Sequence, residues 1–368
     1  DYTGGGSPFT DTDGHGTHVA GTILGNNDVD DSYQGGAPAL GSTTARRFFV
    51  GKRGSAVAFS TWLANMHSSY FDGTLTSPAP MLVSNSYSTN VVSSAYIGSE
   101  SSPRMIDAEA ASHNQLWIWS ASNEGPTAGT IGLESCAKNA LTVGNVIDYD
   151  DAIGDPGTIW TGSSRGPCGG GRWKPNVSAV GQVLYSCTAG TTTGYHNGGG
   201  TSMATPLVAG LAAQLCDHYS FLRYNPSALA ATLMAGSLTK DDQLLTSPSG
   251  SAAHLNAYGA GRVDAYKANY GDSQQALYFW SFDQATGSYV ELDFAVASGA
   301  TRVTVVLNYR ENACSSGASQ ALVNDVDMFL DAEPFTGANN TGDYTAQQSN
   351  VDNNEIRMVN SPTVGDWK

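Results

Sequence analysis

Charged residues are scarce in this chain, and basic ones especially so. Charged side chains make up 14% of the 368 residues, and 17 Lys and Arg stand against 33 Asp and Glu, a formal net charge of −16. A phosphate backbone or an anionic bilayer would repel such a chain, so we expect neither nucleic acid nor a membrane as partner. The acidic balance favours a secreted, extracellular protein, and we expect a monomer.

Long apolar runs and an initiator methionine are also missing. No stretch approaches the roughly 18 apolar residues that a membrane helix needs, and the opening residues do not have the form of a signal peptide. The chain begins with Asp1. We interpret it as a mature or truncated product.

Cysteine is rare, with five residues, an odd number, and no Cys-x-x-Cys pair, which argues against a zinc site. Cys216 lies in an apolar helical run, so we expect a buried thiol there. A disulfide between Cys168 and Cys187 is one candidate in an oxidising compartment, and the pairing stays open.

The chain nevertheless has 40% hydrophobic residues, enough for a full-sized core. Over the first two thirds, short apolar runs alternate with helical patterns, which predicts an α/β fold with a parallel sheet and helices on both faces. Helices are expected over 102–113 and 225–236, each opening on an N-cap residue followed by Pro. The expected strands are residues 81–85, 116–120, 140–146 and 177–180.

The pattern changes after Tyr270. Alternation with a period of two appears at 289–294 and 301–307, and helical periodicity is lost. We therefore predict two domains, one over residues 1–270 and a β-sandwich, jelly-roll-like domain over 271–368 that is itself truncated.

The segment Asp13-Gly14-His15-Gly16-Thr17-His18-Val19 is the first that suggests chemistry. The apolar residues that follow His15 have helical spacing, so His15 stands at the start of a short buried helix with glycines on either side. Taken alone, it would more often be a structural histidine, and two histidines three residues apart also suggest a metal site.

The segment Gly199-Gly200-Thr201-Ser202-Met203-Ala204 runs into a stretch that is apolar on every face. It predicts a central buried helix with Ser202 at its N-terminus, where unpaired N–H groups and the helix dipole favour a developing oxyanion. An isolated Ser in this place would more often be only an N-cap. Asn123 follows the expected strand 116–120, whose carboxyl end faces the same edge, although Asn before a Gly-Pro turn is commonly turn chemistry.

Together, the segments His-Gly-Thr-His-Val-Ala-Gly, Asn-Glu-Gly-Pro and Gly-Thr-Ser-Met-Ala-Thr-Pro resemble, in this order, the signatures of the subtilisin-like serine proteases, peptidase family S8. Ser163-Ser164-Arg165-Gly166-Pro167 resembles a branch of that family in which a β-sandwich follows the protease domain. The resemblance implies a serine endopeptidase acting on polypeptides, with Ser202 as nucleophile, His15 as general base and Asn123 in the oxyanion hole.

The same resemblance implies a peptide-binding strand. Ser86, Tyr87 and Ser88 match its motif, and substrate would lie along it as an added strand. Ser88 and Ser122 stand where the family usually has Gly, both beside the primary specificity pocket. Thr201 completes the expected substrate-binding residues.

The family's catalytic Asp ends an apolar strand well before the His, and no such segment precedes His15. Asp11 and Asp13 directly adjoin the histidine and follow a Gly-rich stretch instead of an apolar run. We therefore expect the Asp to lie upstream of residue 1, and the chain as printed to be inactive without it.

Asp325 and Asp327 are two residues apart on an expected strand and would face one side. They could share a structural Ca²⁺ with Asn353 or Asn354, a cofactor the family resemblance also implies. The alternative is a solvated acidic strand end.

Two other functions compete with an active peptidase. One is a catalytically silent, peptide-binding relative that lacks the Asp, which the upstream coding sequence would distinguish. The other is an esterase, but its Gly-x-Ser-x-Gly elbow and its order of Ser before His do not fit this chain.

Overall fold

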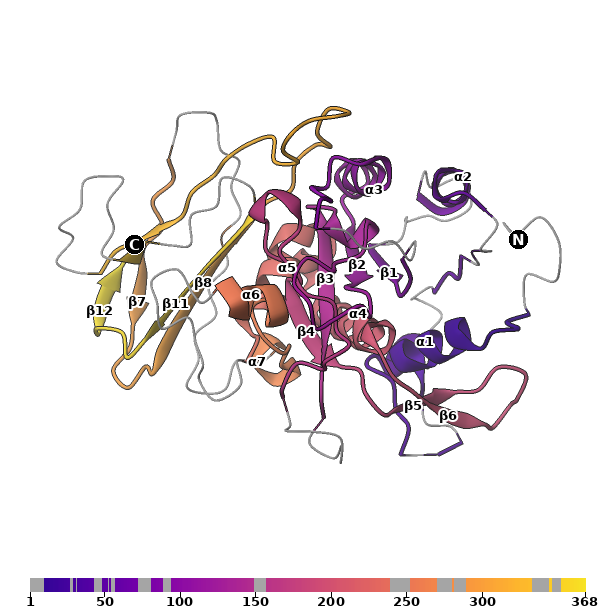
Figure 1. Cartoon of the computed structure of the whole chain (residues 1–368). Helices are drawn as coiled ribbons and strands as arrows, with labels where there is room; N and C mark the ends of the chain where they lie inside the picture. Colours follow the sequence, from indigo (N-terminus) through magenta and orange to yellow (C-terminus); the bar gives the residue numbers. More distant parts are fainter. Residues whose placement is uncertain are drawn as a thin grey trace.

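The computed structural model describes residues 10–26, 29–30, 32–42, 48–51, 53, 57–71, 81–88, 94–148, 157–238, 252–269, 280, 289–332, 344–345 and 352–368. Figure 1 shows a central sheet covered by helices, with the C-terminal strands on one side of it.

The central sheet is parallel and has the order β1-β2-β3-β4. Its strands are Leu82–Asn85, Leu116–Ser120, Ala140–Val146 and Val177–Val180. All four predicted strands are confirmed, and only the first begins one residue later than expected. Every residue of β2 and β3 is buried, as parallel strands covered on both faces require.

Alternate residues of β2 separate the two layers of helices. Leu116 and Ile118 pack in the cluster that contains residues of α4 (Thr201–His218) and α5 (Pro226–Ala235). Trp117 and Trp119 pack against α2 (Phe59–Met66) and α3 (Ser101–Ser112). This period of two confirms the predicted helices on both faces, because successive side chains of a strand point to opposite sides.

The predicted helix boundaries hold to within one residue. α3 begins at Ser101, and α5 has Asn225 as its N-cap, whose Oδ1 accepts a hydrogen bond of 3.0 Å from the Ala228 N–H. Pro226 follows at the first helical position, where its missing N–H costs nothing. The remaining helices are α1 (His15–Leu24), α6 (Ala252–Tyr258) and α7 (Ala265–Asn269), together with short 3-10 turns and a π-helical turn at His67–Phe71.

A short antiparallel hairpin packs beside α1. Its strands are β5 (Leu184–Cys187) and β6 (Tyr195–Gly198). The approach is close, since a Cβ at Gly21 of α1 would lie 2.4 Å from Ser186 Oγ and 2.8 Å from Cys187 Sγ. Glycine is therefore required at this position.

The C-terminal part consists of antiparallel strand pairs. β7 (Phe294–Val296) pairs with β12 (Gly365–Trp367), β8 (Arg302–Asn308) with β11 (Asn354–Asn360), and β9 (Phe329–Leu330) with β10 (Tyr344–Thr345). The first expected strand, 289–294, is wrong in its bounds because regular pairing starts only at Phe294. The second, expected at 301–307, is β8 and is shifted by one residue. The antiparallel character is as predicted, the closed sandwich stays a prediction, and the boundary at 270/271 lies outside the described residues.

The ribbon of β8 and β11 has two packed faces. Val303, Val305 and Val359 join a small cluster around Trp367, which is fully buried. Ile356 and Met358 belong instead to the cluster of α4 and α5. The C-terminal ribbon is thus part of the main hydrophobic core.

The cysteines correct one expectation. Cys168 lies 2.7 Å from Cys136, measured between the Sγ atoms, so the candidate pairing of Cys168 with Cys187 is wrong. Cys187 borders Gly21 of α1 instead. Cys216 is buried as predicted.

Within the described ranges, no helix is both long and apolar enough to cross a membrane.

Candidate active site

Ser202 lies in the first turn of α4, as the sequence predicts. Gly200, the N-cap, has a φ of +136°, a conformation that side chains rarely adopt. The half-buried Ser202 follows the fully buried Thr201. Because the first N–H groups of a helix have no intrahelical acceptor, the Ser202 N–H is a donor aimed out of the helix end.

Asn123 lies three residues after β2 and is bonded directly to the start of α4. Its Oδ1 accepts hydrogen bonds from the Thr201 N–H and from Thr201 Oγ1, both 2.9 Å long. A Cβ on Gly200 would lie 3.3 Å from both the Oδ1 and the Nδ2 of Asn123, so glycine allows this approach. Asn123 is exposed, and with its oxygen occupied its Nδ2 is the donor left for a ligand.

Ser86, directly after β1, is the third contact. Its Oγ donates to the Ser202 carbonyl at 2.8 Å, and the Ser202 Oγ donates to the Ser86 carbonyl at 3.2 Å. The carboxyl ends of β1 and β2 therefore meet the N-terminus of α4, where ligands of open α/β sheets gather.

His15 is the first residue of α1, a helix that packs on α4. Within the described residues, no hydrogen bond joins His15 to Ser202 or to a carboxylate. Catalytic hydrogen bonds are often long before a substrate binds, so His15 can act as a base without a hydrogen bond to Ser202 in the free protein.

Asp11 has a different role. Its Oδ1 accepts from the Gly14 N–H at 2.9 Å, and its Oδ2 accepts from the N–H and the hydroxyl of Thr17, both at 2.7 Å. Partial burial would raise the pKa of Asp11, but these hydrogen bonds hold it below its ordinary value. Asp11 is a cap for α1, and Asp13 is exposed.

His18 is a structural histidine. Its side chain is buried, and Nε2 lies 3.0 Å from the Leu184 carbonyl. Burial lowers the pKa of His18, which favours the neutral ring as donor to that carbonyl. The Nε2 atom of His18 is therefore engaged by a main-chain carbonyl.

The expected pocket residues Ser88 and Ser122 lie together, with 3.1 Å between their Oγ atoms. Ser122 has a φ of +88°, which is unusual for a side-chain-bearing residue. A Cβ at Gly132 would lie 2.4 Å from Ser122 Oγ and 2.9 Å from Ser88 Oγ. Gly132 thus completes this group, and no local pattern could have found it because only the fold brings 88, 122 and 132 together.

Tyr87 does not present its ring to this group. The ring packs at right angles to Trp62 and is covered by the Arg53 guanidinium, 4.7 Å from its centroid. Its carbonyl accepts a hydrogen bond of 2.6 Å from the Trp119 indole. Tyr87 anchors the expected peptide-binding strand to the core.

The expected cation ligands do not come together as a set. Asp325 and Asp327 are exposed, and partial burial and the neighbouring Asp325 charge raise the pKa of Asp327. Asn353 and Asn354 are buried, and their side-chain oxygens accept hydrogen bonds from Asn354 and Asn308. Because Ca²⁺ takes six to eight oxygens, these residues do not fit a complete site.

A serine at a buried helix N-terminus, with a carboxamide donor beside it, on a parallel sheet, is the arrangement of a serine hydrolase. The model of the subtilase family matches residues 1–261 of the 368, and the chain therefore belongs to that family.

Curated relatives are peptidases. Pyrolysin of Pyrococcus furiosus is 29% identical over 280 residues, which cover 61% of this chain and 19% of pyrolysin. Serine protease AprX of Bacillus subtilis is 26% identical over 69% of this chain and 57% of its own. A subtilisin of Bacillus sp. (strain TA39) is 30% identical over a match that covers 57% of this chain and 48% of that subtilisin. The chain spans less than two thirds of each.

Two solved structures share the fold. Sphericase is 24% identical with a TM-score of 0.53, covering 72% of this chain and 82% of its own. The prenylagaramide maturation protease PagA is 18% identical with a TM-score of 0.51, and the match covers 71% of this chain and 84% of PagA. They support the subtilisin-like α/β fold.

Proposed function

We propose that the protein to which this chain belongs is a secreted serine endopeptidase with Ser202 as nucleophile, His15 as general base and Asn123 as oxyanion donor. Family membership and the curated peptidase relatives support the reaction class. The acidic net charge of −16 supports an extracellular site of action on polypeptides.

The observation that carries the proposal is the contact between Asn123 and Thr201. Two hydrogen bonds fix the carboxamide oxygen at the start of α4, so the amide nitrogen and the Ser202 N–H are two donors beside one hydroxyl. Such paired donors stabilise the oxygen of a tetrahedral intermediate far better than they stabilise a ground-state carbonyl.

The chemistry follows from these positions. The Ser202 hydroxyl leaves the Ser86 carbonyl and attacks the substrate carbonyl carbon, while His15 accepts the hydroxyl proton. The oxyanion is held by Asn123 and the Ser202 N–H. On collapse the C–N bond breaks, His15 protonates the leaving amine, and water activated by His15 then hydrolyses the ester on Ser202.

The carboxylate that orients His15 is proposed to come from a strand N-terminal to residue 1. Asp11 cannot supply it in the observed arrangement, because both of its oxygens accept hydrogen bonds from the first turn of α1. The silent, peptide-binding alternative remains the competing function, since it predicts the same fold without that carboxylate.

The test is labelling of the full-length protein with a fluorophosphonate. We expect one label on Ser202 and casein hydrolysis, with both lost by a factor of about 10⁵–10⁶ in Ser202→Ala and His15→Ala. Ser101→Ala and His218→Ala are matched controls on exposed residues and should behave as wild type. Labelling elsewhere, or activity that survives Ser202→Ala, would reject the assignment, and a folded protein that neither labels nor cleaves would support the silent alternative.

A structural calcium ion is a separate proposal, and it rests on the two carboxylates of Asp325 and Asp327. A structural Ca²⁺ near Asp325 and Asp327 would need further oxygen ligands beyond the buried amides. If it exists, excess chelator lowers the Tm of the wild type but not that of Asp325→Asn with Asp327→Asn; equal melting in both would remove this site.

A further inference from the structure

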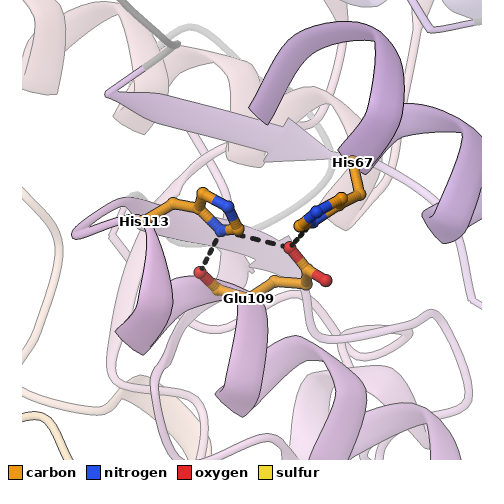
Figure 2. A group of neighbouring side chains, drawn as sticks. All are labelled: His67, Glu109 and His113. Atoms are coloured by element: carbon orange, nitrogen blue, oxygen red, sulfur yellow. Dashed lines mark hydrogen bonds and ion pairs between the residues drawn. The ribbon is translucent and has the colours of Figure 1, made fainter. Parts of the chain in front are cut away.

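A group of metal-ligating side chains lies on the opposite face of the sheet from Ser202. His67 begins the π-helical turn that follows α2, Glu109 is in the last turn of α3, and His113 is the C-cap of α3. Figure 2 shows the two imidazole rings directed at the Glu109 carboxylate from either side. None of these residues takes part in the proposed peptidase chemistry.

The distances are those of a ligand set around one small cation. Glu109 Oε2 lies 3.0 Å from His67 Nδ1 and 3.2 Å from His113 Nδ1, and one ligand atom from each residue lies within 4.8 Å of the others. Ligands bound about 2.0–2.1 Å from a tetrahedral zinc ion lie roughly 3.3 Å from one another. The carboxylate is therefore already at zinc-ligand spacing from both rings.

The surroundings allow an ion to enter and also support the ligands. The side chains of Glu109 and His113 are 19% and 16% exposed, whereas that of His67 is 44% exposed, so one side is open to water. On the other side, Phe71 is buried and packs against the His113 ring and against Trp117. In the metal-free protein His113 Nδ1 also lies 3.1 Å from the backbone carbonyl of Glu109, and binding of a metal to Nδ1 would replace this contact.

Without a metal, each short contact between imidazole and carboxylate needs a proton on the ring nitrogen. One carboxylate then serves two imidazoles. A divalent ion replaces these protons and satisfies all three side chains at once, because neutral imidazole and ionised carboxylate are the forms that bind metal.

We propose that His67, Glu109 and His113 bind a divalent transition metal, with Zn²⁺ as the reference ion and water in the fourth position. Two nitrogen donors favour zinc and its neighbours over Ca²⁺ and Mg²⁺, which select oxygen. His67 and His113 come from different helices, so the ion would join the end of α2 to the end of α3 across the cluster that contains Trp117 and Trp119.

The test measures binding of Zn²⁺ to metal-free full-length protein by equilibrium dialysis, with Co²⁺ absorption as the probe of geometry. We expect one bound equivalent in wild type and in the control His218→Ala. His67→Ala, His113→Ala and Glu109→Gln should each weaken binding more than about 100-fold, since even losses of supporting residues typically cost 10–100-fold. Zinc should also raise the wild-type Tm by at least about 3 °C and leave that of His113→Ala unchanged.

Wild-type protein that binds no zinc, or zinc binding unaltered in both histidine variants, would overturn the proposal. Glu109→Gln keeps the size of the side chain, so it supplies the result even if an alanine variant does not fold. Circular dichroism without metal establishes that each variant is folded before its affinity is compared.

An independent observation concerns Cys136 and Cys168. Their Sγ atoms are 2.7 Å apart, well inside the roughly 3.5–4.0 Å at which unbonded heavy atoms rest, and both residues are buried. Cys136 ends the turn before β3, and Cys168 lies 32 positions later in the segment that leads to β4.

We infer that these two thiols form a disulfide in the mature protein. Each thiol loses one proton and one electron as the S–S bond forms, and an oxidant that itself carries a disulfide accepts the two electrons and two protons and becomes two thiols. The bond would tie the start of β3 to the approach to β4.

Alkylation of the unfolded, unreduced protein followed by peptide mapping tests this pairing. We expect label on Cys187, Cys216 and Cys314 and none on Cys136 or Cys168 until a reductant is added. Label on all five cysteines before reduction, or a peptide that joins Cys168 to Cys187, would contradict the inference. The control Cys187→Ser should leave the mapped bond unchanged.

Discussion

The parallel sheet and the C-terminal ribbon bury their residues to different extents. All seven residues of β3 are buried, whereas all seven of β8 are only half-buried. β3 gains its burial from helices on both faces, but β8 depends on its partner β11 and on one face of α5. The site can therefore be held rigidly by the sheet, while the ribbon must be held by contacts to the sheet domain.

Buried charges make the junction between the two regions. Lys138 Nζ donates to the carbonyls of Asn312 and Ala321 at 2.6 and 3.0 Å and lies 3.4 Å from Glu311 Oε1. Asn139 donates its amide to the Glu311 carbonyl at 2.8 Å. Removing one member would leave an unpaired buried charge, which typically costs about 3–5 kcal/mol, so the regions are expected to unfold together.

The largest effect is expected on the rate of casein hydrolysis, when residues 1–368 alone are compared with a protein that also carries a segment N-terminal to residue 1. Among the described residues no carboxylate contacts His15, and loss of the orienting Asp costs a serine protease about 10⁴ in kcat. We expect residues 1–368 alone to hydrolyse casein at least about 10⁴-fold more slowly than the longer protein. Equal rates, abolished by Ser202→Ala, would place the missing carboxylate within this chain.

Trp367→Ala tests whether the C-terminal part stabilises the whole. Trp367 is fully buried, and loss of a buried Trp typically costs about 3–5 kcal/mol. In urea unfolding of the full-length protein, one transition should move to lower denaturant for every probe, with kcat per folded molecule unchanged. A separate early transition that spares activity would mean that the two regions unfold independently.

Asn123→Ala should act mainly on kcat. It removes a donor to the oxyanion, so kcat is expected to fall about 10²–10³-fold while KM stays near wild type. The Tm should also fall, because the N–H and the hydroxyl of the buried Thr201 lose their acceptor. Steady-state kinetics and thermal unfolding on one sample decide this. A large rise in KM with normal kcat would make Asn123 a substrate-binding residue instead.

The smallest expected effect is a pH dependence at the junction. Burial raises the pKa of Asp107 from 3.8 to about 6, although Lys138 and the Asn139 N–H oppose the shift. The folded state then holds the proton on Asp107 more tightly than the unfolded state does. Protonated Asp107 therefore adds its full contribution to the free energy of unfolding below about pH 4, and this contribution is lost as the pH rises through about 6. It amounts to at most about 3 kcal/mol.

The Asn side chain in Asp107→Asn cannot ionise. The free energy of unfolding of this variant should therefore not show the decrease between about pH 4 and 6 that the ionisation of Asp107 causes in the wild type. Urea unfolding at several pH values measures the difference from wild type. Parallel pH profiles in the two proteins would show that Asp107 stays charged in the folded state.

Sequence reasoning predicted the elements of the sheet almost to the residue, because burial on both faces leaves continuous apolar runs such as 140–146 that turn residues bound. It also placed His15 and Ser202 at helix starts, where Gly14 and Gly200 interrupt the pattern. The first C-terminal strand was less well predicted, since a half-exposed strand has a weaker pattern and its bounds depend on its partner.

The sequence by itself therefore determined the parallel α/β fold of the first part of the chain, the family and the three residues with a proposed chemical role, because each of these residues lies in a contiguous motif. Only the tertiary structure decided which distant residues meet. It bonded Asn123 to Thr201 and Ser86 to Ser202, turned Asp11 into a helix cap, and set Cys136 against Cys168. It also grouped His67, Glu109 and His113, which share no motif and are neighbours only because α2 and α3 cover the same face of the sheet.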